Sequence, residues 1–94
     1  MTALTAEETL QRARRAESII TDPLVAEAFQ AIEATLLKQW RDPDGTPEDR
    51  ERVWLALQNV DVFRGMFERY IRSGKVAARE IEDAQRKKVS NTEP

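Results

Sequence analysis

The chain has 94 residues, which is enough for one small domain. It carries 15 Lys and Arg against 17 Asp and Glu, and the resulting net charge of −2 disfavours non-specific binding to nucleic acid or to an anionic membrane. Cysteine and histidine are both missing, which excludes disulfide bonds, the usual zinc ligands and the Ser-His and Cys-His nucleophile pairs. We therefore expect a non-enzymatic protein that uses no cofactor.

A first helix is predicted to begin after Thr5, because residues 5–8 (Thr-Ala-Glu-Glu) have the form of a capping box. Its apolar stripe is thin and consists of Ala6, Leu10, Ala13, Ala16 and Ile20. Asp22-Pro23 should end this helix, because proline disfavours helical backbone in the residue before it. The same pair suits a new start, with Asp22 as N-cap and Pro23 at the first helical position.

Two long amphipathic segments, residues 24–40 and 53–71, then predict an α-helical hairpin. The second helix should span Pro23 to Trp40, with a stripe made of Val25, Phe29, Ile32, Leu36 and Trp40. A tight loop over residues 42–47 follows, and Thr46 should cap a third helix that begins at Pro47. The main stripe of that helix consists of Val53, Ala56, Leu57, Val60, Phe63, Phe67, Tyr70 and Ile71. We expect it to end at Ser73-Gly74, where glycine can adopt the left-handed conformation.

Residues 76–88 can form a helix but offer few apolar anchors, so an exposed or partner-dependent helix is expected, with disorder over residues 89–94. The predicted fold is all-α: an antiparallel helical hairpin with a short N-terminal helix. Residues 1–75 would form this three-helix domain, and residues 76–94 a charged helical extension and tail. The sequence has no apolar run long enough for a membrane span and no secretory signal, so a cytoplasmic protein is expected.

The third helix carries a second apolar line, made of Leu55, Val62 and Met66, with Trp54 on its flank. This line lies nearly opposite the main stripe, so one neighbouring helix cannot cover both. Either the first helix folds over the line, or the line contacts another copy of the chain or another protein. A small hairpin has little hydrophobic core of its own, and oligomerisation is a common remedy. We predict that Trp54, Leu55, Val62 and Met66 form an interface.

Arg64 lies inside the main stripe of the third helix. Its aliphatic stem could pack while its guanidinium reaches solvent. Alternatively, it could pair with Glu33 or Glu27 of the second helix and fix the register of the hairpin. On the second hypothesis Arg64 also belongs to the residues that control assembly.

Charged clusters are the remaining candidates for a site. The basic ones consist of Arg12, Arg14 and Arg15, and of Arg86, Lys87 and Lys88. Both are accompanied by acidic residues and are expected to be solvated, with nucleic-acid contact through Arg12, Arg14, Arg15, Lys87 and Lys88 as the alternative. The acidic loop residues Asp42, Asp44, Glu48 and Asp49 do not have the spacing of a calcium loop, so we expect them to cap helices.

Four stretches together resemble a group of small, mostly uncharacterised helical proteins of tailed bacteriophages and prophages: residues 22–24, 33–40, 50–57 and 73–77. The resemblance covers about residues 12–78. Similar reading frames lie among head and tail morphogenesis genes, so the resemblance implies a virion component or assembly factor in the host cytoplasm or in the particle.

The expected function is therefore structural. The protein would act through contacts with itself, with a larger phage structural protein, or with both. One alternative is a nucleic-acid-linked phage factor, such as a small packaging subunit or a regulator. A third hypothesis, an inhibitor of a host defence protein, would leave no mark in the sequence.

Overall fold

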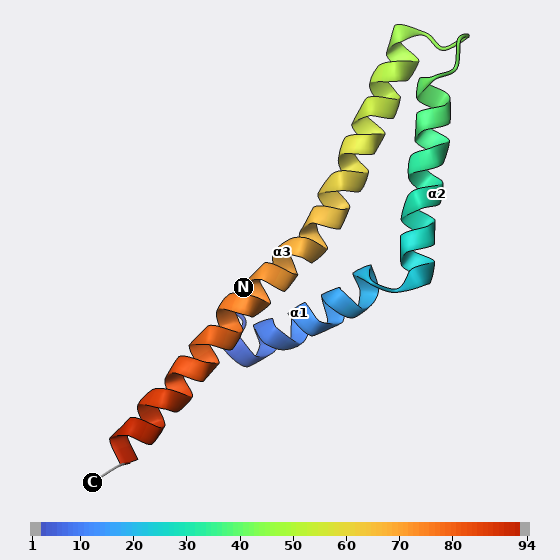
Figure 1. The fold of residues 1–94 in the computed structure, drawn as a ribbon. Helices are drawn as coiled ribbons and strands as arrows, with labels where there is room; N and C mark the ends of the chain where they lie inside the picture. The colour runs from blue at the N-terminus through green and yellow to red at the C-terminus, as the bar shows by residue number, and fades with distance from the viewer. Residues whose placement is uncertain (1–2, 93–94) are drawn as a thin grey trace. The chain divides into compact units, whose positions relative to one another are not determined.

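The protein is all-α. A computed structural model describes residues 3–92, with side chains up to residue 88, and that range contains three helices and no strand. The helices are α1 (Ala6–Ile20), α2 (Pro23–Trp40) and α3 (Pro47–Thr92) (Figure 1). The predicted starts of all three helices and the predicted ends of α1 and α2 are confirmed.

Side-chain caps fix the starts of α1 and α2. The hydroxyl of Thr5 accepts a hydrogen bond from the backbone N–H of Glu8 at 3.1 Å, and the Glu8 carboxylate accepts one from the N–H of Thr5 at 3.2 Å. This reciprocal pair is the predicted capping box, which satisfies two backbone donors at the helix end. At α2, the Asp22 carboxylate accepts a hydrogen bond from the N–H of Leu24 at 2.8 Å. Local sequence therefore decides where these helices begin.

The start of α3 has the same reciprocal geometry. The Thr46 hydroxyl accepts from the N–H of Asp49, and the Asp49 carboxylate accepts from the N–H of Thr46, each at 3.1 Å. The hydrogen bonds from Thr46 lower the pKa of Asp49 below its ordinary value, because they favour the ionised carboxylate. Asp49 therefore caps its helix, as the sequence predicted for the acidic loop.

The predicted end of the third helix at Ser73-Gly74 is wrong. Helix α3 continues through Gly74 to Thr92, and no described residue has a positive φ. Gly74 is buried against α1: a Cβ placed on it would overlap the Cβ of Ala13 and lie 3.6 Å from the Ala13 Cα. The glycine allows α1 and α3 to approach closely. The sequence analysis assigned it to a helix end because glycine is frequent there. The predicted extension from residue 76 is a continuation of α3, and the last two residues of the predicted disordered tail lie outside the described residues.

The chain divides into two compact units. One unit combines α1 up to Ser18 with α3 from Phe67 onward, and the other spans Ile19–Met66. Helix α3 therefore contributes its first half to one unit and its second half to the other. Each unit is described separately below.

In the first unit, α1 packs on the second half of α3 through small residues. The buried positions are Ala13 and Ala16 of α1 and Gly74 and Ala77 of α3. Beside this contact, the guanidinium carbon of Arg12 lies 4.4 Å from the ring centre of Tyr70, a cation–π geometry. Small side chains let helix backbones approach closely, but they bury little apolar area.

In the second unit, α2 and the first half of α3 run antiparallel and are joined by the loop after Trp40 (Figure 1). Phe29 and Val53 are buried, and the Phe29 ring centre lies 6.1 Å from that of Phe63. Most other residues of the two predicted stripes are only half-buried, and Phe63 is 58% exposed. The hairpin therefore forms as predicted but has a thin core. None of the helices within residues 3–92 has an apolar stretch long enough to cross a bilayer.

Candidate protein–protein interface

The second apolar line of α3 is open to solvent. Val62 is 64% exposed, Trp54 51% and Leu55 49%, whereas Met66 is half-buried. Within the second unit, Leu55 and Val62 are therefore left exposed. We call Trp54, Leu55, Val62 and Met66 the α3 line.

Helical periodicity explains why α2 does not cover the α3 line. Packing against α2 uses the side of α3 that carries Val53, Leu57 and Val60, which are buried or half-buried. At 100° per residue, Leu55 and Val62 project from nearly the opposite side. Gly65 lies beside this line, and a Cβ placed on it would meet nothing within 4 Å. The second unit therefore leaves a strip of apolar surface on α3 without a covering element.

Arg64 points across the hairpin and forms an ion pair with Glu33 of α2. Its guanidinium carbon also lies 4.8 Å from the ring centre of Phe29. The side chains of Arg64 and Glu33 are 34% and 36% exposed, so the pair lies at the edge of the thin core. The predicted pairing with Glu33 is confirmed. Its position inside the hairpin separates Arg64 from the α3 line, with which the sequence analysis had grouped it.

A second apolar surface was missed by the sequence analysis. It is a groove of about 400 Å³ between α2 and α3, lined by Val25, Ala28, Phe29, Ile32, Asn59, Val60 and Phe63. We call it the hairpin groove. Sequence periodicity placed Ile32 and Phe63 in the core, yet they are 46% and 58% exposed. A helical wheel shows which residues share a side, but it cannot show whether a third helix is present to bury them.

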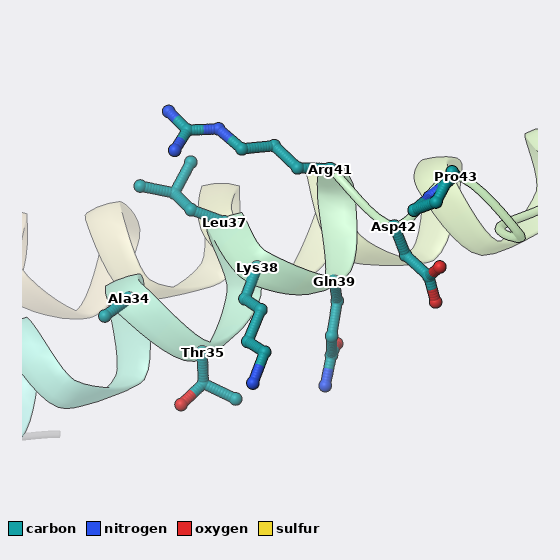
Figure 2. A pocket seen from close by; sticks show the side chains of 8 residues that line it. All are labelled: Ala34, Thr35, Leu37, Lys38, Gln39, Arg41, Asp42 and Pro43. Carbon is teal, nitrogen blue, oxygen red and sulfur yellow. The ribbon is translucent and has the colours of Figure 1, made fainter.

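Another hollow in the second unit does not gather functional groups. It has a volume of about 940 Å³ and lies at the end of α2, lined by Ala34, Thr35, Leu37, Lys38, Gln39, Arg41, Asp42 and Pro43. Figure 2 shows Leu37 and Arg41 on one side of α2 and Thr35, Lys38 and Gln39 on another. Catalytic sites need polar groups that converge on one point, and these side chains diverge. The hollow is an open surface feature.

The predicted basic clusters stay on the surface. Arg14, Arg15, Lys87 and Lys88 are exposed, and Arg12 is half-buried over Tyr70. Arg86 donates a hydrogen bond to Glu82 at 2.8 Å, and this bond raises the pKa of Arg86. In the acidic loop, the Asp42 carboxylate accepts a hydrogen bond from the N–H of Asp44 at 3.0 Å, so it stabilises the turn. Arg12, Arg86 and Asp42 therefore take part in contacts that stabilise the local structure.

Comparison with known proteins finds no matching family model, no matching curated protein and no matching solved structure. The apolar surfaces of the second unit are accordingly the observations on which a function can be argued.

Proposed function

We propose that this protein is a non-enzymatic assembly protein, which self-associates and docks onto a larger protein through helical surfaces. One observation carries the proposal: the α3 line, where Trp54, Leu55 and Val62 are each about half exposed or more. Exposed apolar side chains scattered singly are ordinary on protein surfaces. Several on one helix, with Gln58 and Asn59 as uncharged polar neighbours, form the kind of surface that occurs at contact sites.

Covering the α3 line would contribute a few kcal/mol to a contact with another protein. Complete burial of a large apolar side chain stabilises by about 1.5–3 kcal/mol, so three half-exposed ones offer a few kcal/mol together. Each ~1.4 kcal/mol of this gain corresponds to a tenfold change in affinity. Trp54 adds to the argument, because tryptophan is enriched among the residues that contribute most to protein interfaces.

The resemblance to small proteins of tailed phages supplies the biological context of the proposal. Under it, the protein would be a virion component or an assembly factor that contacts a larger structural protein during head or tail assembly. The surface chemistry supports a role of this kind, because the exposed features include large apolar side chains on helices, and the net charge of −2 provides no overall attraction to nucleic acid. Mass spectrometry of purified particles from cells that carry the gene would show whether the chain travels with virions.

Sedimentation of the full chain tests the contact role directly. Wild-type protein should sediment as a dimer or larger species at micromolar concentration, and Leu55→Asp should shift it towards monomer. The control is Gln30→Asp, which adds the same charge at an exposed position of α2 that lies in neither apolar surface. Circular dichroism should show the same helical content for all three proteins. A wild-type protein that is purely monomeric and co-purifies with no partner would refute the proposed function.

A further inference from the structure

Helix α3 carries a row of residues that extends the α3 line in both directions. Positions that are alternately three and four residues apart lie on one side of a helix, and this is the spacing of helices that pair along their length. The row consists of Glu48, Glu51, Leu55, Gln58, Val62, Gly65, Arg69 and Arg72. All of these residues are exposed except Gly65, which is half-buried. We call them the heptad row.

The heptad row is acidic at its start, uncharged in its middle and basic at its end. Glu48 and Glu51 lie twelve and nine residues before residue 60, and Arg69 and Arg72 lie nine and twelve residues after it. Opposite charges therefore occupy positions at equal distances from one point of the helix. Among the residues that the structure describes, no ion pair engages any of these four side chains. Their charges are available to a partner.

We propose that the heptad row is the self-association surface of this protein, and that two copies of α3 pack along it in antiparallel orientation. The contact has a twofold axis at the level of residue 60, so each interaction occurs twice. Glu48 of one copy then lies beside Arg72 of the other, and Glu51 lies beside Arg69. This inference rests on the proposed function, since it names the partner and the geometry of its self-association.

The uncharged middle of the row supplies the apolar part of the contact. Leu55 of one copy lies beside Gly65 of the other, where a Cβ would meet nothing within 4 Å in its own chain, so there is room for the leucine. Val62 lies beside Gln58, which carries no charge. Burial of Leu55 and Val62 from both copies contributes affinity, and the charged ends of the row set the orientation.

The order of the charges favours an antiparallel second copy over other occupants. A nucleic acid is uniformly anionic, so the basic end of the row would attract it and the acidic end would repel it. A different protein would have to carry the same two charges in the opposite order, which a second copy already does. A parallel copy shifted by 21 residues, the separation of Glu48 and Arg69, would match these charges only once and would place Val62 beside Asp83.

Charge reversal at the two ends of the row tests the pairing. Glu48→Lys/Glu51→Lys and Arg69→Glu/Arg72→Glu should each raise the dissociation constant at least about tenfold, because like charges then face each other. The chain that carries all four substitutions has opposite charges again and should associate as the wild type does. An equimolar mixture of the two double variants should form pairs with one chain of each kind. Sedimentation at low salt gives the dissociation constants, and native mass spectrometry identifies the species.

The matched controls reverse the same charges outside the row. Glu7→Lys/Glu27→Lys changes two exposed acidic residues, of which Glu7 lies in the first turn of α1 as Glu48 lies in the first turn of α3. Arg14→Glu/Arg15→Glu changes two exposed arginines of α1. Both controls should retain the wild-type dissociation constant.

A smaller set of variants covers the case in which a double variant loses helical content in circular dichroism. Glu51→Lys and Arg69→Glu, alone and combined in one chain, then repeat the design with one kind of pair. Each single variant should weaken association, and the combined chain should recover it.

The outcomes distinguish this inference from the proposed function. The antiparallel pairing is overturned if the double variants keep the wild-type dissociation constant, if the chain with all four substitutions does not recover association, or if the mixture associates no better than either variant alone. In that case a loss of association in Leu55→Asp would leave the proposed function intact, with another geometry at the α3 line. A wild-type chain that is monomeric at every concentration would overturn this inference and the self-association of the proposed function together.

Discussion

Gly74 of α3 lies so close to Ala13 of α1 that a Cβ on the glycine would overlap the Cβ of the alanine. This single contact explains why a glycine stands in the interior of a long helix, where it costs about 0.5–1 kcal/mol relative to alanine. It also explains why the buried residues of the first unit, within the range whose side chains the structure describes, are the small ones Ala13, Ala16, Gly74 and Ala77.

Gly74→Ala is therefore expected to destabilise the protein by about 1–2 kcal/mol, because the overlap with Ala13 outweighs the gain in helix propensity. Ala13→Gly/Gly74→Ala should recover most of this loss, since it moves the same methyl group from one helix to the other. Thermal and urea unfolding followed by circular dichroism measure both. A double variant no more stable than Gly74→Ala alone would contradict the contact.

Gly65→Ala provides the opposite case on the same helix. A Cβ at residue 65 meets nothing within 4 Å in the chain, so only the helix-propensity gain remains. The free energy of unfolding should rise by about 0.5–1 kcal/mol. Urea unfolding checks the sign, and a decrease would show that Gly65 is packed closely against something that the isolated chain does not contain.

Arg64→Met tests the ion pair inside the hairpin. Methionine retains a stem that can pack on Phe29, but it removes the cation–π contact and leaves the Glu33 carboxylate without its partner, so the free energy of unfolding should fall by up to about 1 kcal/mol. A double-mutant cycle with Glu33→Gln should give a coupling energy of about 0–1 kcal/mol that decreases with added salt, since both partners are about one-third exposed.

The same variant tests whether Arg64 fixes the register of the hairpin. If it does, Arg64→Met should loosen assembly beyond its small effect on stability, and the dissociation constant in sedimentation should increase. An unchanged dissociation constant would limit the role of Arg64 to a local pair.

Asp49 should make the start of α3 sensitive to acid. Its pKa is lowered from the ordinary 3.8 by hydrogen bonds from Thr46, so its contribution to stability is present above pH 3.8 and is lost as the pH falls through the lowered value. Asp49→Asn should therefore be less stable than wild type at pH 7, and the difference should shrink below about pH 4. Urea unfolding at a series of pH values measures it. A difference that stays constant with pH would show that the carboxylate charge is not involved.

The positions of the helix starts followed from the sequence because capping is local. Thr5 with Glu8, Asp22 before Pro23, and Thr46 with Asp49 each satisfy backbone donors within three residues, so no distant contact is needed to place them. The amphipathic stripes of α2 and α3 likewise predicted the hairpin, and the pairing of Arg64 with Glu33 could be anticipated from their places on facing helices. Exposure could not be anticipated, because it depends on how many helices surround each stripe.

The sequence by itself determined an all-α chain, its helix starts and the presence of more apolar surface on the third helix than one neighbour can cover. Only the tertiary structure decided the role of Gly74. Its local sequence is typical of a helix end, but the residue lies inside α3 in close contact with Ala13. It also decided that Ile32 and Phe63 line an open groove, while Leu55 and Val62 stay uncovered. The physical reason is that hydrogen bonding and capping act over a few residues, whereas burial is a property of whichever segments meet in space.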